Sequence, residues 1–432
     1  MSNKIVIFLK IMKTILLLGL GRSTNTLIKY LLQSEELNIK VVLADKVLSP
    51  FVKDYINYEN CEFVEFNIEN VDLRKKLILK SDLVVSMLPP RFHVLVANEC
   101  VNFKKNLVTA SYVSNEIQNL DQEAKKSNIL ILNEIGLDPG IDHISAMEVI
   151  DSLHNQDAKI TTFKSFCGGL IAPESDNNPW NYKITWNPRN IILAGKDGAT
   201  YLKDGLEKTF NYNEVFNHVE YVDIPNCGRF ESYANRNSLH YKEKYNLQDA
   251  KTIVRGTIRS VGFCKAWNIF VQLGMTSETN SDFISKQNFL NYMNNIADPD
   301  VHEKMNYLDL HNSCYSNMNY DSSYSYLMNV LSEKWSLSNS DIDMIVMQHK
   351  FVYQLNGKNH KLNLSMVVKG EDTIHTGMAK TVGLPVFFAC KLILQNKISL
   401  KGVRIPVYPE IYKPILKELS QNGIHFIRTS IS

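Results

Sequence analysis

The chain has 432 residues, of which 44% are hydrophobic and 21% charged, and its formal net charge is +2. This balance is typical of a globular protein of two or three domains, and it excludes a global basic field that would attract nucleic acid or an anionic membrane. The seven cysteines never form a CxxC pair. Their spacing argues against a disulfide framework and a structural zinc site, so we expect a cytoplasmic protein with no metal.

The N-terminus carries a short apolar run that is interrupted by Lys10. The run is too short to cross a bilayer, and it lacks the small-residue cleavage site of a signal peptide. We expect translation to start at Met12. Since no other segment approaches the length of a membrane span, we expect no membrane partner.

The first third of the chain alternates predicted strands and helices. Continuous apolar runs, typical of strands buried on both faces, lie at 14–21, 39–46, 81–90, 106–112 and 129–136. Between them, helical patterns lie at 23–34, 93–103 and 116–127. This alternation predicts an α/β fold with a parallel, doubly wound sheet covered by helices.

The pattern changes after about residue 145. Tyrosines, branched residues and alternating polarity predict strands at 160–169, 218–225, 251–263, 343–355 and 360–370. These strands indicate a second domain with a mixed or antiparallel sheet. The polar stretch 275–340 looks like a small helical insertion, and the C-terminal segment returns to helical periodicity. We expect that last segment to pack back onto the first domain.

The segment "LLLGLGRST" matches the first two glycines of a dinucleotide fingerprint, Gly19 and Gly21, while Thr24 replaces the third. Gly19 permits the tight turn, and Gly21 lets the backbone approach a pyrophosphate at the helix N-terminus. Asp45 ends the second strand, where a carboxylate accepts hydrogen bonds from a ribose 2′-hydroxyl and repels a 2′-phosphate. The alternative is a glycine turn that binds no nucleotide. The predicted cofactor contacts are Gly19, Gly21, Arg22, Ser23, Thr24 and Asp45.

The segment "SMLPP" ends another predicted strand at the edge of the sheet where the binding crevice of such folds lies. We predict that the backbone of Met87 and Leu88 flanks the nicotinamide ribose. The alternative is an ordinary pair of strand-ending prolines.

The segment "NEIGLDPGIDH", residues 133–143, leaves the sheet at the same edge. Its glycines allow backbone to lie close to a ligand, and Pro139 stiffens the turn. We predict that Asp138 points towards the nicotinamide, where a carboxylate can hold an ammonium group and handle its protons. Asp142 is the predicted N-cap of the next helix. His143 is either structural or a proton carrier.

The stretch 165–186 contains a glycine pair, prolines and aromatic residues, and it is typical of a lid or a substrate wall. Cys167 is either a nucleophile or a small buried thiol. Arg236 lies between two asparagines, where its guanidinium suits bidentate capture of a carboxylate, the alternative being a solvated surface arginine. Arg255 and Arg259 are further candidates for carboxylate binding.

The segments "TASYVS", "NEIGLDPGIDH", "SFCGGLIAPESDNNPWNYKITW", "YANRNS", "IVRGTIR" and "QHKF", in this order, resemble the saccharopine dehydrogenases of the L-glutamate-forming type. The resemblance runs from Met12 almost to the C-terminus and is most specific in residues 107–264. It implies the interconversion of saccharopine, NAD(P)+ and water with L-glutamate, 2-aminoadipate 6-semialdehyde and NAD(P)H in lysine metabolism, and a homodimer.

The same resemblance implies an architecture. It predicts a Rossmann domain over 12–135 that is completed by 391–432. It also predicts a mixed α/β substrate-binding and dimerisation domain over 136–274 and 341–390, and a small helical domain over 275–340.

The resemblance also implies roles for individual residues. Tyr112, Asp138 and Cys167 are the polar groups expected nearest the chemistry. Leu137 and Trp186 are expected against the cofactor. The expected substrate contacts are Ser111, Tyr112, Asp138, Arg236 and Thr257.

The choice of cofactor depends on one position. Asp45 stands where fungal NADP-dependent members carry an arginine, so we predict that NAD is preferred, with NADP as the alternative because Lys46 follows. Carboxynorspermidine and homospermidine synthases are a rival class, but a polyamine substrate needs acids rather than arginines in its site. A third hypothesis is a regulatory protein that binds NAD(H) without catalysis.

Overall fold

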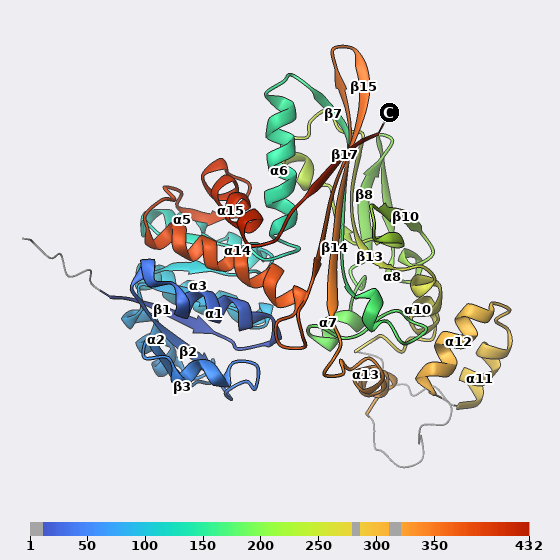
Figure 1. The fold of residues 1–432 in the computed structure, drawn as a ribbon, viewed down its shortest axis with the longest axis horizontal. Coiled ribbons are helices and arrows are strands. Elements are labelled where there is room, and N and C mark those ends of the chain that lie inside the picture. Colours follow the sequence, from blue (N-terminus) through green and yellow to red (C-terminus); the bar gives the residue numbers. More distant parts are fainter. Residues whose placement is uncertain (1–11, 279–285, 311–320, 432) are drawn as a thin grey trace, which may run out of the picture. The chain divides into compact units, whose positions relative to one another are not determined.

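The computed structural model describes residues 12–278, 286–310 and 321–431. The first eleven residues, on which the predicted start at Met12 depends, lie outside these ranges. The chain divides into two compact units, 12–145 with 379–422 and 146–378 with the residues from 423 onwards. Each unit is built on its own sheet (Figure 1).

The first unit contains a seven-stranded sheet in the order β16-β6-β5-β4-β1-β2-β3, and every neighbouring pair is parallel. The apolar runs form strands because both faces of the sheet are buried, so the predicted doubly wound α/β fold is confirmed. The strands are β1 (Lys13–Leu18), β2 (Ile39–Asp45), β3 (Cys61–Glu65), β4 (Leu83–Ser86), β5 (Asn106–Val108), β6 (Leu130–Leu132) and β16 (Gly402–Arg404).

The sequence reasoning missed two strands, β3 and β16, and one helix, α2, in this unit. β3 lies at the edge of the sheet and consists of half-buried and exposed residues, so it shows no continuous apolar run. The buried residues of α2 are Arg74 and Ile78, so this helix shows no wide apolar stripe. The helices are α1 (Asn25–Gln33), α2 (Val71–Lys80), α3 (His93–Asn102), α4 (Asn115–Gln118), α5 (Asp121–Lys126), α14 (Gly377–Leu394) and α15 (Pro409–Gln421), with α6 (Ile141–His154) leading into the second unit.

Helix α14 packs closely against α1. A Cβ atom at Gly383 would lie 2.7 Å from the backbone nitrogen of Leu27, so only glycine permits this approach. One turn further along, the rings of Tyr30 and Phe387 meet edge to face with centroids 5.4 Å apart. The predicted return of the C-terminal segment to the first domain therefore begins earlier than residue 391.

Helix α14 also corrects an expectation about membrane spans. It is 18 residues long and apolar enough to cross a membrane, whereas we expected no segment of that length. However, 78% of it is buried inside the protein. This burial is typical of a core helix, since the side chains that would face lipid face the protein instead.

The second unit contains a mixed sheet in the order β10-β11-β13-β7-β14-β15-β17. Off this path, β8 pairs with β13, and β9 and β12 pair with β8. Only β7–β13 and β8–β12 are parallel pairs among those described. Figure 1 shows β14 and β15 as a long hairpin. The strands are β7 (Lys159–Ile171), β8 (Ala199–Lys203), β9 (Leu206–Phe210), β10 (Val219–Ile224), β11 (Gly228–Ala234), β12 (Arg236–Asn237), β13 (Thr252–Ser260), β14 (Asp343–Leu355), β15 (Lys358–Lys369) and β17 (Ile427–Ile431).

The helices of residues 286–334 belong to this second unit. Trp180, Trp267 and Trp335 belong to one apolar core that also contains Met305 and Leu327, so the described parts of the polar stretch 275–340 share the core of the second unit. The helices are α7 (Pro188–Ile192), α8 (Tyr212–Val215), α9 (Tyr241–Lys244), α10 (Phe263–Gln272), α11 (Lys286–Asn294), α12 (Pro299–Leu308) and α13 (Ser323–Lys334).

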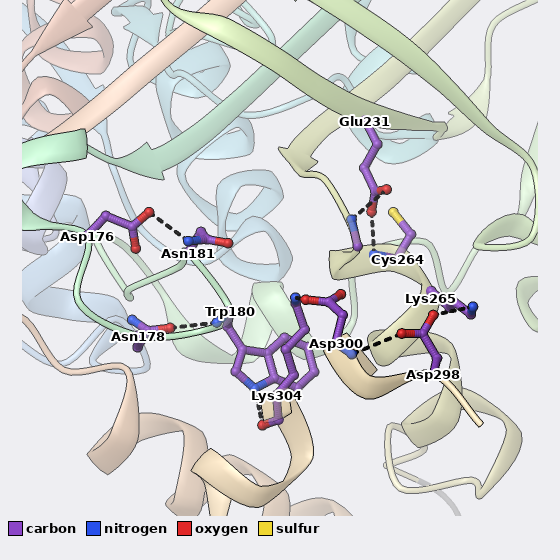
Figure 2. A network of polar contacts seen from close by, with 11 residues as sticks. Asp176, Asn178, Trp180, Asn181, Glu231, Cys264, Lys265, Asp298, Asp300 and Lys304 are labelled. Carbon is purple, nitrogen blue, oxygen red and sulfur yellow. Dashed lines mark hydrogen bonds and ion pairs between the residues drawn. The ribbon is translucent and has the colours of Figure 1, made fainter. Parts of the chain in front are cut away.

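Polar contacts fasten α12 to the rest of this core, as Figure 2 shows. The indole Nε1–H of Trp180 donates to the carbonyl oxygen of Lys304 over 2.6 Å. The ammonium of Lys304 pairs with Asp300, and Lys265 of α10 pairs with Asp298. Because these groups satisfy one another, the polar helix can pack over an aromatic core.

Two further features differ from the sequence predictions. The strand predicted at 160–169 extends to Ile171 as β7, so the first part of the stretch 165–186 is strand rather than lid, and the following loop buries Trp180 and Tyr182. At the C-terminus, β17 pairs with β15 of the second sheet, so residues 427–431 do not complete the first unit. Both differences have the same cause, since long-range strand pairing overrides the local glycine and loop signals.

Candidate functional site

The glycine turn after β1 leaves no room for a side chain at its first glycine. Gly19 has φ +93°, and a Cβ atom there would lie 2.8 Å from the carbonyl oxygen of Met87. The N–H of Gly19 donates to the carbonyl oxygen of Ala44 at 2.9 Å. The predicted turn residue and the predicted "SMLPP" segment are thus direct neighbours, because β1 and β4 pair in the sheet.

Gly21 fits a bound phosphate. It precedes the helical segment that begins at Arg22, and no heavy atom lies within 4 Å of a Cβ built on it. The first turn carries no acidic residue that would repel an anion from the positive end of the helix. Thr24, which replaces the third glycine, is buried and donates its hydroxyl to the carbonyl oxygen of Gly21 at 2.7 Å. These features suit the pyrophosphate of a dinucleotide.

Asp45 lies beside this turn. Its carboxylate accepts from the N–H of Leu20 and from the N–H of Lys46, each at 2.6 Å. The acid thus has a structural part in holding the turn as well as its predicted part in cofactor choice. The guanidinium of Arg22, another predicted cofactor contact, lies over the ring of Phe51.

The segment 133–143 forms a tight loop between β6 and α6. A Cβ at Gly140 would lie 2.0 Å from the carbonyl oxygen of Gly136, so the two glycines permit a backbone contact that no other residue allows. Asp138 is exposed at the tip of this loop, where the hydroxyl of Tyr112 donates to its Oδ1 at 3.2 Å. Two of the predicted catalytic residues are therefore in direct contact. Leu137 is buried next to them.

The other acid of this segment has a different place. α6 begins at Ile141, so Asp142 lies in the first turn and is not the N-cap that we predicted. Its buried carboxylate accepts from the N–H of Gly140 at 2.5 Å and so still stabilises the start of the helix. The prediction failed by two positions because the loop closes through Gly140 before the helix begins.

A buried pair, which sequence reasoning did not single out as a pair, supports this loop. Glu134 bonds to the Nε2 atom of His143 at 2.8 Å and accepts from the N–H of Val113 at 3.1 Å. Both side chains are buried. This geometry favours the structural alternative for His143, because the pair ties the segment that carries Tyr112 to α6.

A second histidine, which carried no motif in the sequence, lies at the edge of the same sheet. His93, the first residue of α3, contacts the hydroxyls of Ser86 and Ser111, each at 2.8 Å. Ser111 is a predicted substrate contact. Burial lowers the pKa of His93 to about 4.

In the second unit, the predicted residues Cys167 and Thr257 are direct neighbours across β7 and β13. Tyr233 of β11 lies opposite Thr257, so the three side chains share one face of the sheet. Cys167 is buried in a central strand, which favours the interpretation as a small buried thiol. The hydroxyl of Thr257 accepts from the side-chain amide of Asn235 at 3.3 Å.

The three arginines of this unit have different surroundings. Arg236 is exposed on β12 with φ +59°, so it can reach a ligand. Arg255 is buried, and its guanidinium lies 4.5 Å from the ring centre of Tyr241. Arg259 is buried among aromatic rings, and its Nε–H has no hydrogen-bond partner. Arg259 and Thr257 are two residues apart on β13, so their side chains lie on the same face of the sheet. A buried guanidinium with an unused N–H donor suits an anionic ligand. Trp186 is half-buried against the tryptophan core.

Two family models match the chain. The saccharopine dehydrogenase NADP binding domain matches residues 15–132, and the saccharopine dehydrogenase C-terminal domain matches residues 136–424. The chain belongs to the saccharopine dehydrogenase family. The predicted resemblance is thereby confirmed, and the first unit is the family's dinucleotide-binding domain.

Individual saccharopine dehydrogenases are similar over nearly the full chain. The enzyme of Pyricularia oryzae, named saccharopine dehydrogenase [NADP(+), L-glutamate-forming], is 31% identical over 95% of this chain and 97% of its own length. The apo structure of the Saccharomyces cerevisiae L-Glu-forming enzyme is 30% identical, covers 97% of this chain and 100% of its own, and has a TM-score of 0.86. The rat mitochondrial alpha-aminoadipic semialdehyde synthase is 31% identical over 96% of this chain, which spans 47% of that protein.

A homospermidine synthase from Legionella pneumophila shares the fold, with a TM-score of 0.60 and 8% identity. At that identity the likeness carries no information about substrate. The rival polyamine synthases are thus similar in fold alone, whereas the saccharopine dehydrogenases match in sequence as well.

Among the residues that the structure describes, no group of three or more histidine, cysteine, aspartate or glutamate side chains is placed to hold a metal ion. The six cysteines in the described ranges form no disulfide.

Proposed function

We propose that this protein is an L-glutamate-forming saccharopine dehydrogenase, an oxidoreductase of lysine metabolism that acts on a CH–NH group. Saccharopine, NAD(P)+ and water are converted to L-glutamate, 2-aminoadipate 6-semialdehyde, NAD(P)H and a proton, and the reaction is reversible. The observation that carries the proposal is the contact between Tyr112 and Asp138 at the carboxyl edge of a dinucleotide-binding sheet, in a chain about as long as relatives that bear this name.

The bound dinucleotide supplies the hydride acceptor. Asp138 holds the secondary ammonium of saccharopine by its negative charge and takes up the proton of that ammonium, so that the nitrogen lone pair can form the imine as the attached carbon gives up its hydride. Tyr112 keeps the carboxylate in place through its hydroxyl. The imine of the substrate is then attacked by water, and the resulting carbinolamine breaks its C–N bond to release L-glutamate and the semialdehyde.

The arginines supply the other half of the recognition. Saccharopine carries three carboxylates, and a planar guanidinium binds a carboxylate with two parallel hydrogen bonds. Arg236 and Arg259 are the proposed partners, with Thr257 as a neutral contact beside Cys167. The two arginines argue against a polyamine substrate, because their positive charges would repel its ammonium groups.

The direct test follows the absorbance of the reduced nicotinamide when purified protein is mixed with saccharopine and each oxidised cofactor in turn. Formation of glutamate in equal amount supports the proposal. Tight binding of dinucleotide without turnover of saccharopine would instead favour a regulatory protein that binds NAD(H).

Substitution of Arg236 tests substrate recognition. We expect Arg236→Ala to raise the KM for saccharopine by a factor that corresponds to roughly 2–4 kcal/mol and to leave kcat nearly unchanged, because the arginine grips a carboxylate in the ground and transition states alike. Arg236→Lys keeps the charge and should recover part of the loss. Steady-state kinetics measure both. An unchanged KM in the alanine variant would mean that Arg236 is a solvated surface arginine that does not bind the substrate.

Cofactor choice is tested at Asp45. We expect the wild type to prefer NAD and Asp45→Arg to shift the ratio of kcat/KM towards NADP by at least about tenfold, because a cation replaces a charge that repels the 2′-phosphate. Asp45→Asn is the matched control, since it keeps an acceptor for the N–H of Leu20 and removes only the charge. The names of several fungal relatives specify NADP(+) as the cofactor. If the wild-type protein has a higher kcat/KM with NADP than with NAD, this interpretation of Asp45 is wrong.

A homodimer and a cytoplasmic location are also part of the proposal. Scattered cysteines without CxxC pairs support a reducing compartment. Light scattering coupled to gel filtration tests the oligomer, and fluorescence microscopy of the tagged full chain tests the location.

A further inference from the structure

A line of hydrogen bonds runs through the first unit from its interior to the predicted substrate contact Ser111. The hydroxyl of Ser86, at the end of β4, lies 2.8 Å from Nδ1 of His93. Nε2 of the same ring lies 2.8 Å from the hydroxyl of Ser111, which follows β5. The hydroxyl of Thr109 lies 3.4 Å from Nε2 and accepts from the N–H of Ser111 at 3.3 Å. Both nitrogens of the ring are therefore engaged by hydroxyls.

The members of this line differ in burial. Ser86 and Thr109 are 0% exposed and His93 is 1% exposed, whereas Ser111 is half-buried. Only the last hydroxyl is thus accessible to a ligand. Since burial lowers the pKa of His93 to about 4, the ring is neutral at neutral pH. The hydrogen-bond partners of the ring are the hydroxyls of Ser86, Ser111 and Thr109, which are all uncharged.

A neutral imidazole has one donor nitrogen and one acceptor nitrogen. If Nε2 carries the proton, it donates to Ser111, and the hydroxyl hydrogen of Ser111 is left to point outward. Nδ1 then accepts from Ser86. In the other tautomer Ser111 must donate inward to Nε2 and can only accept from a ligand. Because a carboxylate only accepts hydrogen bonds, binding of a carboxylate requires the first tautomer.

We propose that His93 is a positioning residue for substrate binding: its buried, neutral ring, protonated on Nε2, fixes the hydroxyl of Ser111 as a hydrogen-bond donor to a carboxylate of the substrate. The inference rests on the proposed function, which supplies the carboxylate, and assigns no proton transfer to His93. Ser86 then acts indirectly, because its hydroxyl donates to Nδ1 and so favours the tautomer with the proton on Nε2.

The first experiment reads the tautomer directly. The ¹⁵N shifts of the imidazole nitrogens in wild-type protein labelled at histidine distinguish a protonated from an unprotonated nitrogen, and the His93→Gln variant assigns the signals. We expect Nε2 protonated and Nδ1 bare, with no titration between about pH 6 and 8 because the pKa lies below that range. A proton on Nδ1, or on both nitrogens, overturns the proposal whatever the enzyme's activity.

The second experiment is a double-mutant cycle on the KM for saccharopine. We expect His93→Leu to raise KM about tenfold at nearly constant kcat, His93→Gln to recover much of this loss because its amide N–H replaces Nε2–H, and Ser111→Ala to match the leucine variant. In the Ser111→Ala background, His93→Leu should have no further effect. Equal losses in both backgrounds would mean that His93 does not act through Ser111.

Val96→Ala is the matched control, because Val96 lies one turn further along α3 and is buried like His93. It should lower the melting temperature and leave KM unchanged, so a rise of KM in this variant too would show that any disturbance of α3 has the same effect. If the wild type fails to turn over saccharopine, the proposed function fails, and the tautomer measurement still decides the state of His93. If the wild type is active and the cycle is additive, the positioning role alone fails.

Discussion

Asp138→Asn is expected to lower kcat/KM for saccharopine by at least about 100-fold and to change the pH profile, while the melting temperature stays near that of the wild type. The amide still accepts a hydrogen bond from Tyr112, but it cannot hold an ammonium by charge or take up its proton. Stability is unaffected because Asp138 is exposed at the tip of its loop. Steady-state kinetics across pH, together with thermal unfolding, measure the two effects separately.

Asp142 provides the contrast within the same loop. Asp142→Ala removes the acceptor of a buried backbone N–H, that of Gly140, so we expect a loss of roughly 1–3 kcal/mol in the free energy of unfolding and nearly intact catalysis in the folded fraction. If Asp138→Asn kept wild-type kinetics while well-folded Asp142→Ala protein was inactive, the roles of the two carboxylates would be the reverse of those assigned.

The second large effect is expected at the glycine turn. Gly19→Ala should lower the free energy of unfolding by roughly 2–4 kcal/mol, because the residue has φ +93° and the new Cβ would lie 2.8 Å from the backbone oxygen of Met87. The backbone of a neighbouring strand end cannot give way as a flexible side chain would. Chemical denaturation monitored by circular dichroism measures the loss.

Gly21→Ala is the matched variant two residues away. Gly21 has φ −72° and nothing within 4 Å of the added methyl group, so stability should change by less than about 0.5 kcal/mol. The methyl group would instead occupy the space of the pyrophosphate and raise the Kd for the dinucleotide about tenfold or more. Unchanged binding, measured by titration calorimetry, would mean that the phosphates do not approach this glycine.

Much of the first unit was predictable because its signals are local. A strand buried on both faces must be apolar throughout, and a helix on that sheet must carry an apolar stripe, so the runs before Gly19 and Asp45 and the stripe of α1 were recognisable. Edge strands escape this rule, and β3 was missed for that reason. Residues 165–169 carried two competing predictions, a strand from their branched and aromatic residues and a lid from their glycines, and pairing with β13 and β14 decides for the strand.

The candidate site divides along the same line. The sequence by itself determined the residues whose chemistry depends on the turn that carries them: Gly19 and Gly21 at a strand end, Asp45 after the second strand, and Asp138 between two glycines. Only the tertiary structure decided that Tyr112 contacts Asp138, that Asp142 bonds to the loop, and that Arg255 packs on Tyr241. His93 is the clearest case. Its partners Ser86 and Ser111 are 7 and 18 residues away, and they meet on one ring because β4 and β5 are neighbours in the sheet. Strand order is a long-range property of the packed chain, and no local pattern around a lone histidine contains it.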